Sequence, residues 1–139
     1  MATLVVDTGH DIVGIFSVQS RCFAVYRGQS IARAIRRLQS AHEVITYNGK
    51  NYDLEELAKF AGLSGDLPLN GVHSDMRSIC WSDRIWGRDL VSTYKMHLDD
   101  CPTFPDTHEG SVERDCYMTF KLWQLWKRDQ LKIMDGNPT

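Results

Sequence analysis

Three short apolar or β-branched runs crowd the start of this chain, and their spacing constrains the fold more than any other feature. The links between them are brief and turn-like, Gly9-His10-Asp11 and Gln19-Ser20-Arg21. Links this short join antiparallel strands, because parallel neighbours need a long crossover connection. The sequence therefore predicts an antiparallel meander made of Leu4 to Val6, Ile12 to Val18 and Cys22 to Tyr26.

Helices are expected to enter after the meander. Ser30 is a suitable N-cap for a helix from Ile31 to about Ala41, whose apolar positions follow the spacing of a core-facing stripe. Val44 to Tyr47 is the next expected strand. Asp53 is the expected N-cap of a helix that runs from Leu54 to Phe60 or Ala61 and ends at Gly62.

The remaining segments complete an α/β pattern. Val72 to Trp81 is expected to hold a fifth strand followed by a turn, after a loop from Gly65 to Gly71. A helix is expected from Asp89 to Leu98, a surface loop from Cys101 to Gly110, and a last helix from about Ser111 to Leu131. This order predicts one domain, residues 1–139, with a mixed five-stranded sheet flanked by helices, and it fits an RNase-H-like α/β fold.

Composition excludes some classes of protein. The formal net charge of −2 argues against coating nucleic acid by charge alone. No apolar run approaches the roughly 18 residues of a membrane span, and no signal-peptide pattern opens the chain, so a cytoplasmic location and no membrane contact are expected. The four cysteines contain no C-x-x-C pair, which favours reduced thiols over a zinc site.

Three aspartates are the candidate chemical groups. Asp7 ends the first apolar run, Asp53 closes a polar strand-to-helix junction, and Asp115 borders a wide apolar helix face. Each has an ordinary structural alternative: Asp7 as a strand-ending residue satisfied by its turn, Asp53 as an N-cap, and Asp115 as a salt-bridge partner of Arg114. If the three converge at one sheet edge, their carboxylates would suit a divalent metal ion.

These segments resemble the DEDD family of 3′–5′ exonucleases over nearly the whole chain. The most specific match is the second motif, Asn-x-x-x-aromatic-Asp, which here reads Asn48-Gly49-Lys50-Asn51-Tyr52-Asp53. Asp7-Thr8-Gly9 falls on the first motif, Asp-x-Glu, and Asp115 falls on the last-helix Asp. Asp75, in the segment similar to the family's fifth strand, is expected to be structural rather than catalytic.

The resemblance implies a two-metal hydrolysis of phosphodiester bonds. Two Mg²⁺ or Mn²⁺ ions would be held by Asp7, Asp53 and Asp115, with single-stranded DNA or RNA 3′ ends as substrate. Asn48 and Tyr52 would shape the substrate cleft, and Lys50 is a candidate phosphate contact.

Two departures from the family pattern bear on activity. The first-motif Glu falls on Gly9, which weakens the ion site on the water side, and the usual His or Tyr falls on Gly110 or Ser111. His108 is nearby but in another register. Three alternatives stay open: an active nuclease in which His108, Glu109 or Asp11 substitutes, a degenerate nuclease that binds nucleic acid or a protein partner, or a Gly9 introduced to silence the site.

Tryptophans offer a further possible contact with unpaired bases. Trp123 and Trp126 are expected to pack the last helix on the sheet, whereas Trp86, beside Arg84 and Arg88, is a better stacking candidate than Trp81.

Overall fold

The computed structural model describes residues 1–50, 52–83, 85, 89–100 and 102–133. Five strands form one mixed sheet in the order β3-β2-β1-β4-β5. The expected meander is confirmed: β1 (Thr3–Gly9) pairs antiparallel with β2 (Ile12–Ser17), which pairs antiparallel with β3 (Phe23–Arg27). β4 (Glu43–Thr46) pairs parallel with β1, and β5 (Val72–Asp75) pairs parallel with β4.

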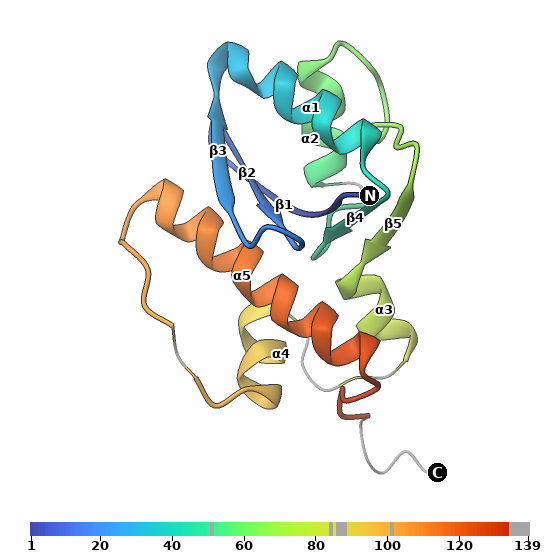
Figure 1. The fold of residues 1–139 in the computed structure, drawn as a ribbon, viewed down its shortest axis with the longest axis vertical. Coiled ribbons are helices and arrows are strands. Elements are labelled where there is room, and N and C mark those ends of the chain that lie inside the picture. The colour runs from blue at the N-terminus through green and yellow to red at the C-terminus, as the bar shows by residue number, and fades with distance from the viewer. Residues whose placement is uncertain (51, 84, 86–88, 101, 134–139) are drawn as a thin grey trace.

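Helices cover both faces of the sheet (Figure 1). On one face lie α1 (Ile31–Ser40), after a short 3₁₀ turn over Gly28–Ser30, and α2 (Asp53–Phe60). On the other face, α5 (His108–Lys127) crosses β1 and β2 and is flanked by α3 (Met76–Ser82) and α4 (Leu90–His97). The predicted α/β fold class, with a five-stranded mixed sheet flanked by helices, is therefore confirmed.

Each face of the sheet has its own hydrophobic core, as strand alternation requires. Leu4 and Val6 point into the core under α1 and α2, whereas Val5 points into the core under α5. The same alternation places Asp7 and Gly9 on the α5 side of β1. Trp123 and Trp126 pack into the α5 core, as expected.

Three predicted elements are wrong in part. Val72 to Trp81 does not end in a simple turn, because Asp75 caps the N-terminus of α3 by accepting a hydrogen bond from the Arg77 N–H. The last helix begins at His108 rather than Ser111, since Thr107 caps it through the Gly110 N–H, and it ends at Lys127 rather than Leu131. Asp53 is the first residue of α2, and the residue at the N-cap position is Tyr52.

The structure also bears on the expectations for the cysteines and for membrane spans. Cys22, Cys80 and Cys116 are free thiols, and the latter two are buried, while Cys101 lies outside the described residues. In the described part of the chain, no helix has the length and apolarity needed to cross a membrane.

Candidate functional site

The candidate site lies where the three parallel strands end. β1, β4 and β5 run in the same direction, so their carboxyl ends meet at one edge of the sheet. Asp7 is near the end of β1, and Asp75 ends β5. Asn48 is the second residue after the end of β4. Crevices at the carboxyl ends of parallel strands are the usual binding places of α/β sheets.

Asp7 is the most perturbed carboxyl group at this edge. Burial raises its pKa to about 9, and the negative charges of Asp53 and Asp115 act in the same direction. The Thr8 N–H and the Arg114 guanidinium oppose this effect without cancelling it. Burial and two like charges therefore outweigh the opposing effects of Thr8 and Arg114 on the pKa of Asp7, and such perturbed groups are common at functional sites.

Asp53 reaches the same edge from the other layer of helices. It is only 4% exposed, and its Oδ1 accepts hydrogen bonds from both the Thr8 hydroxyl and the Thr8 N–H, the latter at 3.3 Å. Burial raises its pKa to about 6, the two Thr8 bonds lower it, and Asp75 and Asp115 raise it further. The predicted capping role of Asp53 is thus replaced by a tie between α2 and β1.

Asp115 comes from the middle of α5 and already has a cationic partner. Arg114 donates from Nε at 3.1 Å and from Nη2 at 2.9 Å, both to Asp115 Oδ1. The salt-bridge alternative raised from the sequence is therefore present. The second carboxylate oxygen of Asp115 is not involved in these two bonds, and the charge of Asp115 still acts on both Asp7 and Asp53.

Asp75 holds the polar turn of the second motif in place. Its Oδ1 accepts from the Asn48 N–H at 2.7 Å, and its Oδ2 accepts from the Lys50 N–H at 3.1 Å. Asn48 has a left-handed φ of 65°, and a Cβ on Gly49 would lie 2.4 Å from Thr46 Cβ. The structural role expected for Asp75 is confirmed. We call this hydrogen-bonded segment, Asn48 to Lys50 with Asp75, the turn side of the site.

The predicted substrate contacts lie on the outside of the turn. Tyr52 is 64% exposed and Lys50 is exposed, while Asn48 is half-buried. Lys50 also borders a pocket of about 660 Å³ along the β5 edge, shared with His73 and Ser78. These positions are accessible to a ligand, and their contact with a substrate stays a prediction. Asn51 of the same motif lies outside the described residues.

The candidate replacement groups have partners other than the aspartates. His108, which was expected on a loop, begins α5, and its ring packs edge-on against His10 with centroids 6.4 Å apart. Glu109 pairs with Arg27 at 3.1 Å, and Asp11 pairs with His10 at 3.3 Å. His108 lies seven residues before Asp115 on the same helix, about 10 Å along its axis. The structure does not bring it to the acids.

Glycines close the opposite side of the site. A Cβ on Gly9 would lie 2.9 Å from Ile12 Cγ2 and 3.1 Å from Val112 Cγ2, and a Cβ on Gly14 would lie 2.4 Å from Val112 Cγ1. On α5, a Cβ on Gly110 would lie only 2.0 Å from the Pro105 carbonyl oxygen. Close packing therefore crowds Gly9, the position that the resemblance assigns to the family's Glu, and Gly110, one of the two positions that it assigns to the His or Tyr. We call Gly9, Gly14 and Gly110 with Val112 the glycine side.

The donors fit a hard divalent cation in their chemistry. Carboxylate oxygens are the ligands that Mg²⁺ and Mn²⁺ prefer, and a cation would relieve the repulsion that raises the pKa of Asp7. In the part of the chain that the structure describes, no three His, Cys, Asp or Glu side chains are grouped closely enough to hold an ion as they stand.

Sequence reasoning named Arg114 as a partner of Asp115, and the structure contains that pair, but it missed Val112 altogether. No signal in the sequence indicates that Val112 fills the space beside Gly9 and Gly14. The helix after β5 had a usable signal, because Asp75 stands directly before Met76 as an N-cap would.

No family model matches the chain, and no curated protein matches it.

Proposed function

We propose that the chain is an RNase-H-like domain of DEDD type that hydrolyses phosphodiester bonds at nucleic-acid 3′ ends with divalent metal ions. The observation that carries this proposal is the coupling of three carboxylates at one sheet edge, where burial and like charges raise the pKa of Asp7 to about 9. A fold stabilised by packing alone has no need for such a group. The second-motif turn, held by two bonds to Asp75, adds support.

Asp7, Asp53 and Asp115 would hold the metal ions, Mg²⁺ or Mn²⁺. When bound, such ions supply charge stabilisation of the phosphoryl oxygens and a more acidic water. The protein's own part is to position: Thr8 orients Asp53, and Asp75 sets the backbone of Asn48 and Lys50. Exposed Lys50 and Tyr52 would contact the substrate beside them.

A second function is favoured by the glycine side. A Cβ at Gly9 would press on the Ile12 and Val112 side chains, and a Cβ at Gly110 would meet the Pro105 carbonyl, so the two positions that the resemblance assigns to the rest of the catalytic set are crowded. A protein with this packing would keep the nucleic-acid surface but lose hydrolysis. The alternative is therefore a binding module on the same scaffold, with nucleic acid or a protein as its partner.

Digestion of labelled oligonucleotides separates these two functions. Single-stranded DNA and RNA, labelled at the 3′ or the 5′ end, are incubated with the chain in Mn²⁺ or in EDTA. Asp7→Asn is compared with Asp11→Asn, a matched change at an exposed Asp in the adjacent turn. Gly9→Glu is combined with Val112→Ala, which removes one of the two side-chain contacts, with Ile12 and with Val112, that the new Cβ would make.

Metal-dependent shortening from the 3′ end, lost in Asp7→Asn and kept in Asp11→Asn, is the expected result. Cleavage only by Gly9→Glu/Val112→Ala would replace the exonuclease proposal with the binding module. The melting temperature in Mn²⁺ gives a readout that is independent of cleavage. It should rise for the original chain and not for Asp7→Asn, and the absence of any rise would contradict the metal site itself.

A further inference from the structure

Helix α3 presents an aromatic ring and a guanidinium group together on its outer surface. Trp81 is 62% exposed, and the Arg77 guanidinium carbon lies 5.6 Å from the centre of its ring. The two residues are one helical turn apart and share a face, whereas Met76 and Cys80 turn inward to the core. Most of the indole surface is thus left in water, because Met76 and Cys80 are the side chains of α3 that are buried in the core.

This pair lies next to the carboxylate edge. α3 begins where β5 ends, directly after Asp75, and β5 is one of the three strands whose carboxyl ends form this edge. The Arg77 N–H donates to Asp75 at 3.1 Å, so the first turn of α3 is tied to the same carboxylate that holds the turn side. The pair of Arg77 and Trp81 therefore leads from the end of β5 along α3 to the surface.

A second cation borders the same path. The backbone N–H groups of Lys50 and Arg77 both donate to the Asp75 carboxylate, at 3.1 Å each. One buried anion therefore fixes the backbones of two residues whose exposed side chains are cationic. The Asp75 charge is itself satisfied by three N–H donors, Asn48 included, and is turned inward. The outer rim of the turn side is basic and aromatic, although the whole chain has a net charge of −2.

We propose that Arg77 and Trp81 form a binding platform for an unpaired nucleotide of a single-stranded nucleic acid. The base stacks on the free face of the Trp81 ring, and Arg77 contacts the adjoining phosphate while it stays over the other face. This inference rests on the proposed function, since it supplies the strand whose end reaches Asp7. An isolated exposed ring beside cations suits a single strand, because the bases of a duplex are already stacked on each other.

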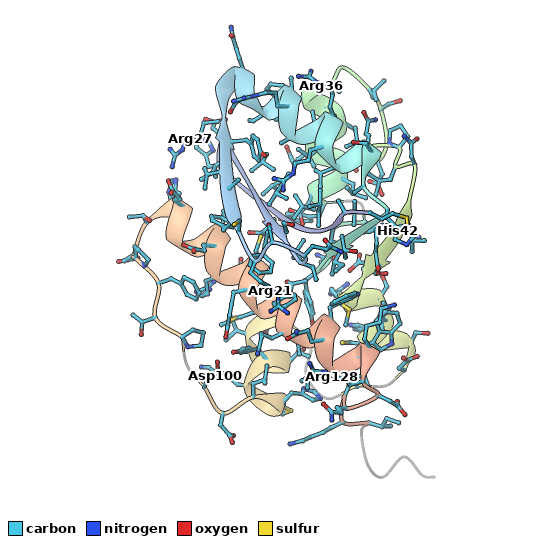
Figure 2. The ribbon with its side chains drawn as sticks, viewed as in Figure 1. Arg21, Arg27, Arg36, His42, Asp100 and Arg128 are labelled. Carbon is cyan, nitrogen blue, oxygen red and sulfur yellow. The ribbon has the colours of Figure 1, made fainter. Side chains whose placement is uncertain are left out.

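Equilibrium binding in EDTA tests the platform without cleavage. Fluorescence anisotropy of a short labelled oligothymidylate is measured with the original chain, Trp81→Ala and Arg77→Ala. Phe60→Ala is the matched aromatic control, because Phe60 is exposed on α2, across the sheet. Arg36→Ala is the matched cationic control, since Arg36 lies on α1 at the end of the molecule away from α3 (Figure 2).

Trp81→Ala should weaken binding about tenfold, as expected for the loss of one base–aromatic stack. Arg77→Ala should weaken binding and reduce the slope of log affinity against log salt by about 0.7, the value for one phosphate contact on a single strand. The two controls should bind as the original chain does. Melting temperatures of all variants verify that each is folded.

The outcomes separate this inference from the proposed function. Unchanged affinity in Trp81→Ala and Arg77→Ala overturns the platform, whatever the digestion shows. Weakened binding in both, with no cleavage by the original chain, upholds the platform and contradicts only the nuclease. If the original chain binds no oligonucleotide, or if Trp81→Ala instead converts a dimer to a monomer in size-exclusion chromatography, Trp81 serves another contact and the platform is wrong.

Discussion

The turn side and the glycine side of the site are built by opposite means. On the turn side, hydrogen bonds from the backbone of Asn48 and Lys50 to Asp75 hold polar groups at the surface. On the glycine side, Val112 and the Pro105 carbonyl fill the space that side chains at Gly9 and Gly110 would need. Asp7 is on the α5 face of β1, as Val5 is.

This difference separates what the site keeps from what it lacks. Hydrogen bonds to a buried carboxylate fix a backbone in one conformation, and such a conformation is useful where a ligand must be met. Close apolar packing stabilises the fold equally well, but it leaves no room for a functional group. The turn side is therefore equipped to bind, and the glycine side limits what chemistry can follow.

Among changes on the two sides, removing the Asp75 carboxylate should lower the free energy of unfolding the most. Asp75→Ala leaves three backbone N–H groups without their acceptor, so we expect a loss of about 4 kcal/mol in the free energy of unfolding. Urea denaturation measures the loss. Asp89→Ala, which removes an exposed cap of α4, is the control and should cost less than Asp75→Ala. A loss for Asp75→Ala no larger than that for Asp89→Ala would contradict the role of Asp75 as the anchor of the turn.

Adding a methyl group on the glycine side should have the next largest effect. Gly to Ala within a helix normally stabilises it by about 1 kcal/mol. Gly110→Ala should instead destabilise the chain by about 2 kcal/mol, because the new Cβ meets the Pro105 carbonyl oxygen, which is backbone and yields little. Urea denaturation gives the sign. A stabilised Gly110→Ala would show that the loop before α5 moves aside and that the glycine side is open after all.

The titration of Asp7 should make the free energy of unfolding depend on pH. Its pKa is about 9 in the folded protein against an ordinary value of 3.8, so the folded state binds more protons than the unfolded chain within that window. The contribution of Asp7 to the free energy of unfolding is therefore greatest near pH 4 and falls as pH rises towards 9, by up to about 1.4 kcal/mol per pH unit. Asp53, with a pKa of about 6, contributes only below that pH.

Asp7→Asn removes the larger part of this dependence. In EDTA, the variant should be more stable than the original chain at pH 8, and its stability should be nearly flat between pH 6 and 9, as measured by urea denaturation at each pH. Asp11→Asn, at an exposed residue, should keep the original slope. An original chain whose stability does not change over this window would mean that Asp7 is ionised and compensated by a group other than those described.

The sequence predicted the turn side better than the glycine side, for a physical reason. Asn48-Gly49 and the following Asp53 are local signals of a turn and a helix start, and local geometry follows from neighbouring residues. The place of Val112 beside Gly9 depends on how closely α5 approaches the sheet, which is a long-range packing result. No periodicity encodes it. The same holds for His10 against His108, a contact between residues far apart in the chain.

Element boundaries failed where a cap was overlooked. Thr107 accepts a hydrogen bond from the Gly110 N–H and starts α5 at His108, yet Pro105 and Gly110 in the sequence favoured a loop. Asp75 starts α3 in the same manner. Asp53 was predicted as the N-cap of α2 but is the first residue of that helix. Its carboxylate bonds to Thr8 on β1 rather than to its own helix. Capping side chains can serve either a helix or a distant partner, and the sequence alone does not distinguish them.

The smallest expected effect concerns the pair formed by Arg114 and Asp115. Both side chains are partly exposed, so Asp115→Asn should change the free energy of unfolding in EDTA by only about 0.5 kcal/mol. Arg114→Gln should be as small in stability, yet it frees Asp115 from a competing cation and should raise the affinity for Mn²⁺ several-fold, measured by titration calorimetry. Arg128→Gln, at the far end of α5 (Figure 2), is the matched control and should leave that affinity unchanged. Because Arg114 and a metal ion would neutralise the same carboxylate, a weaker Mn²⁺ affinity in Arg114→Gln would mean that Asp115 belongs to the helix surface and not to the ion site.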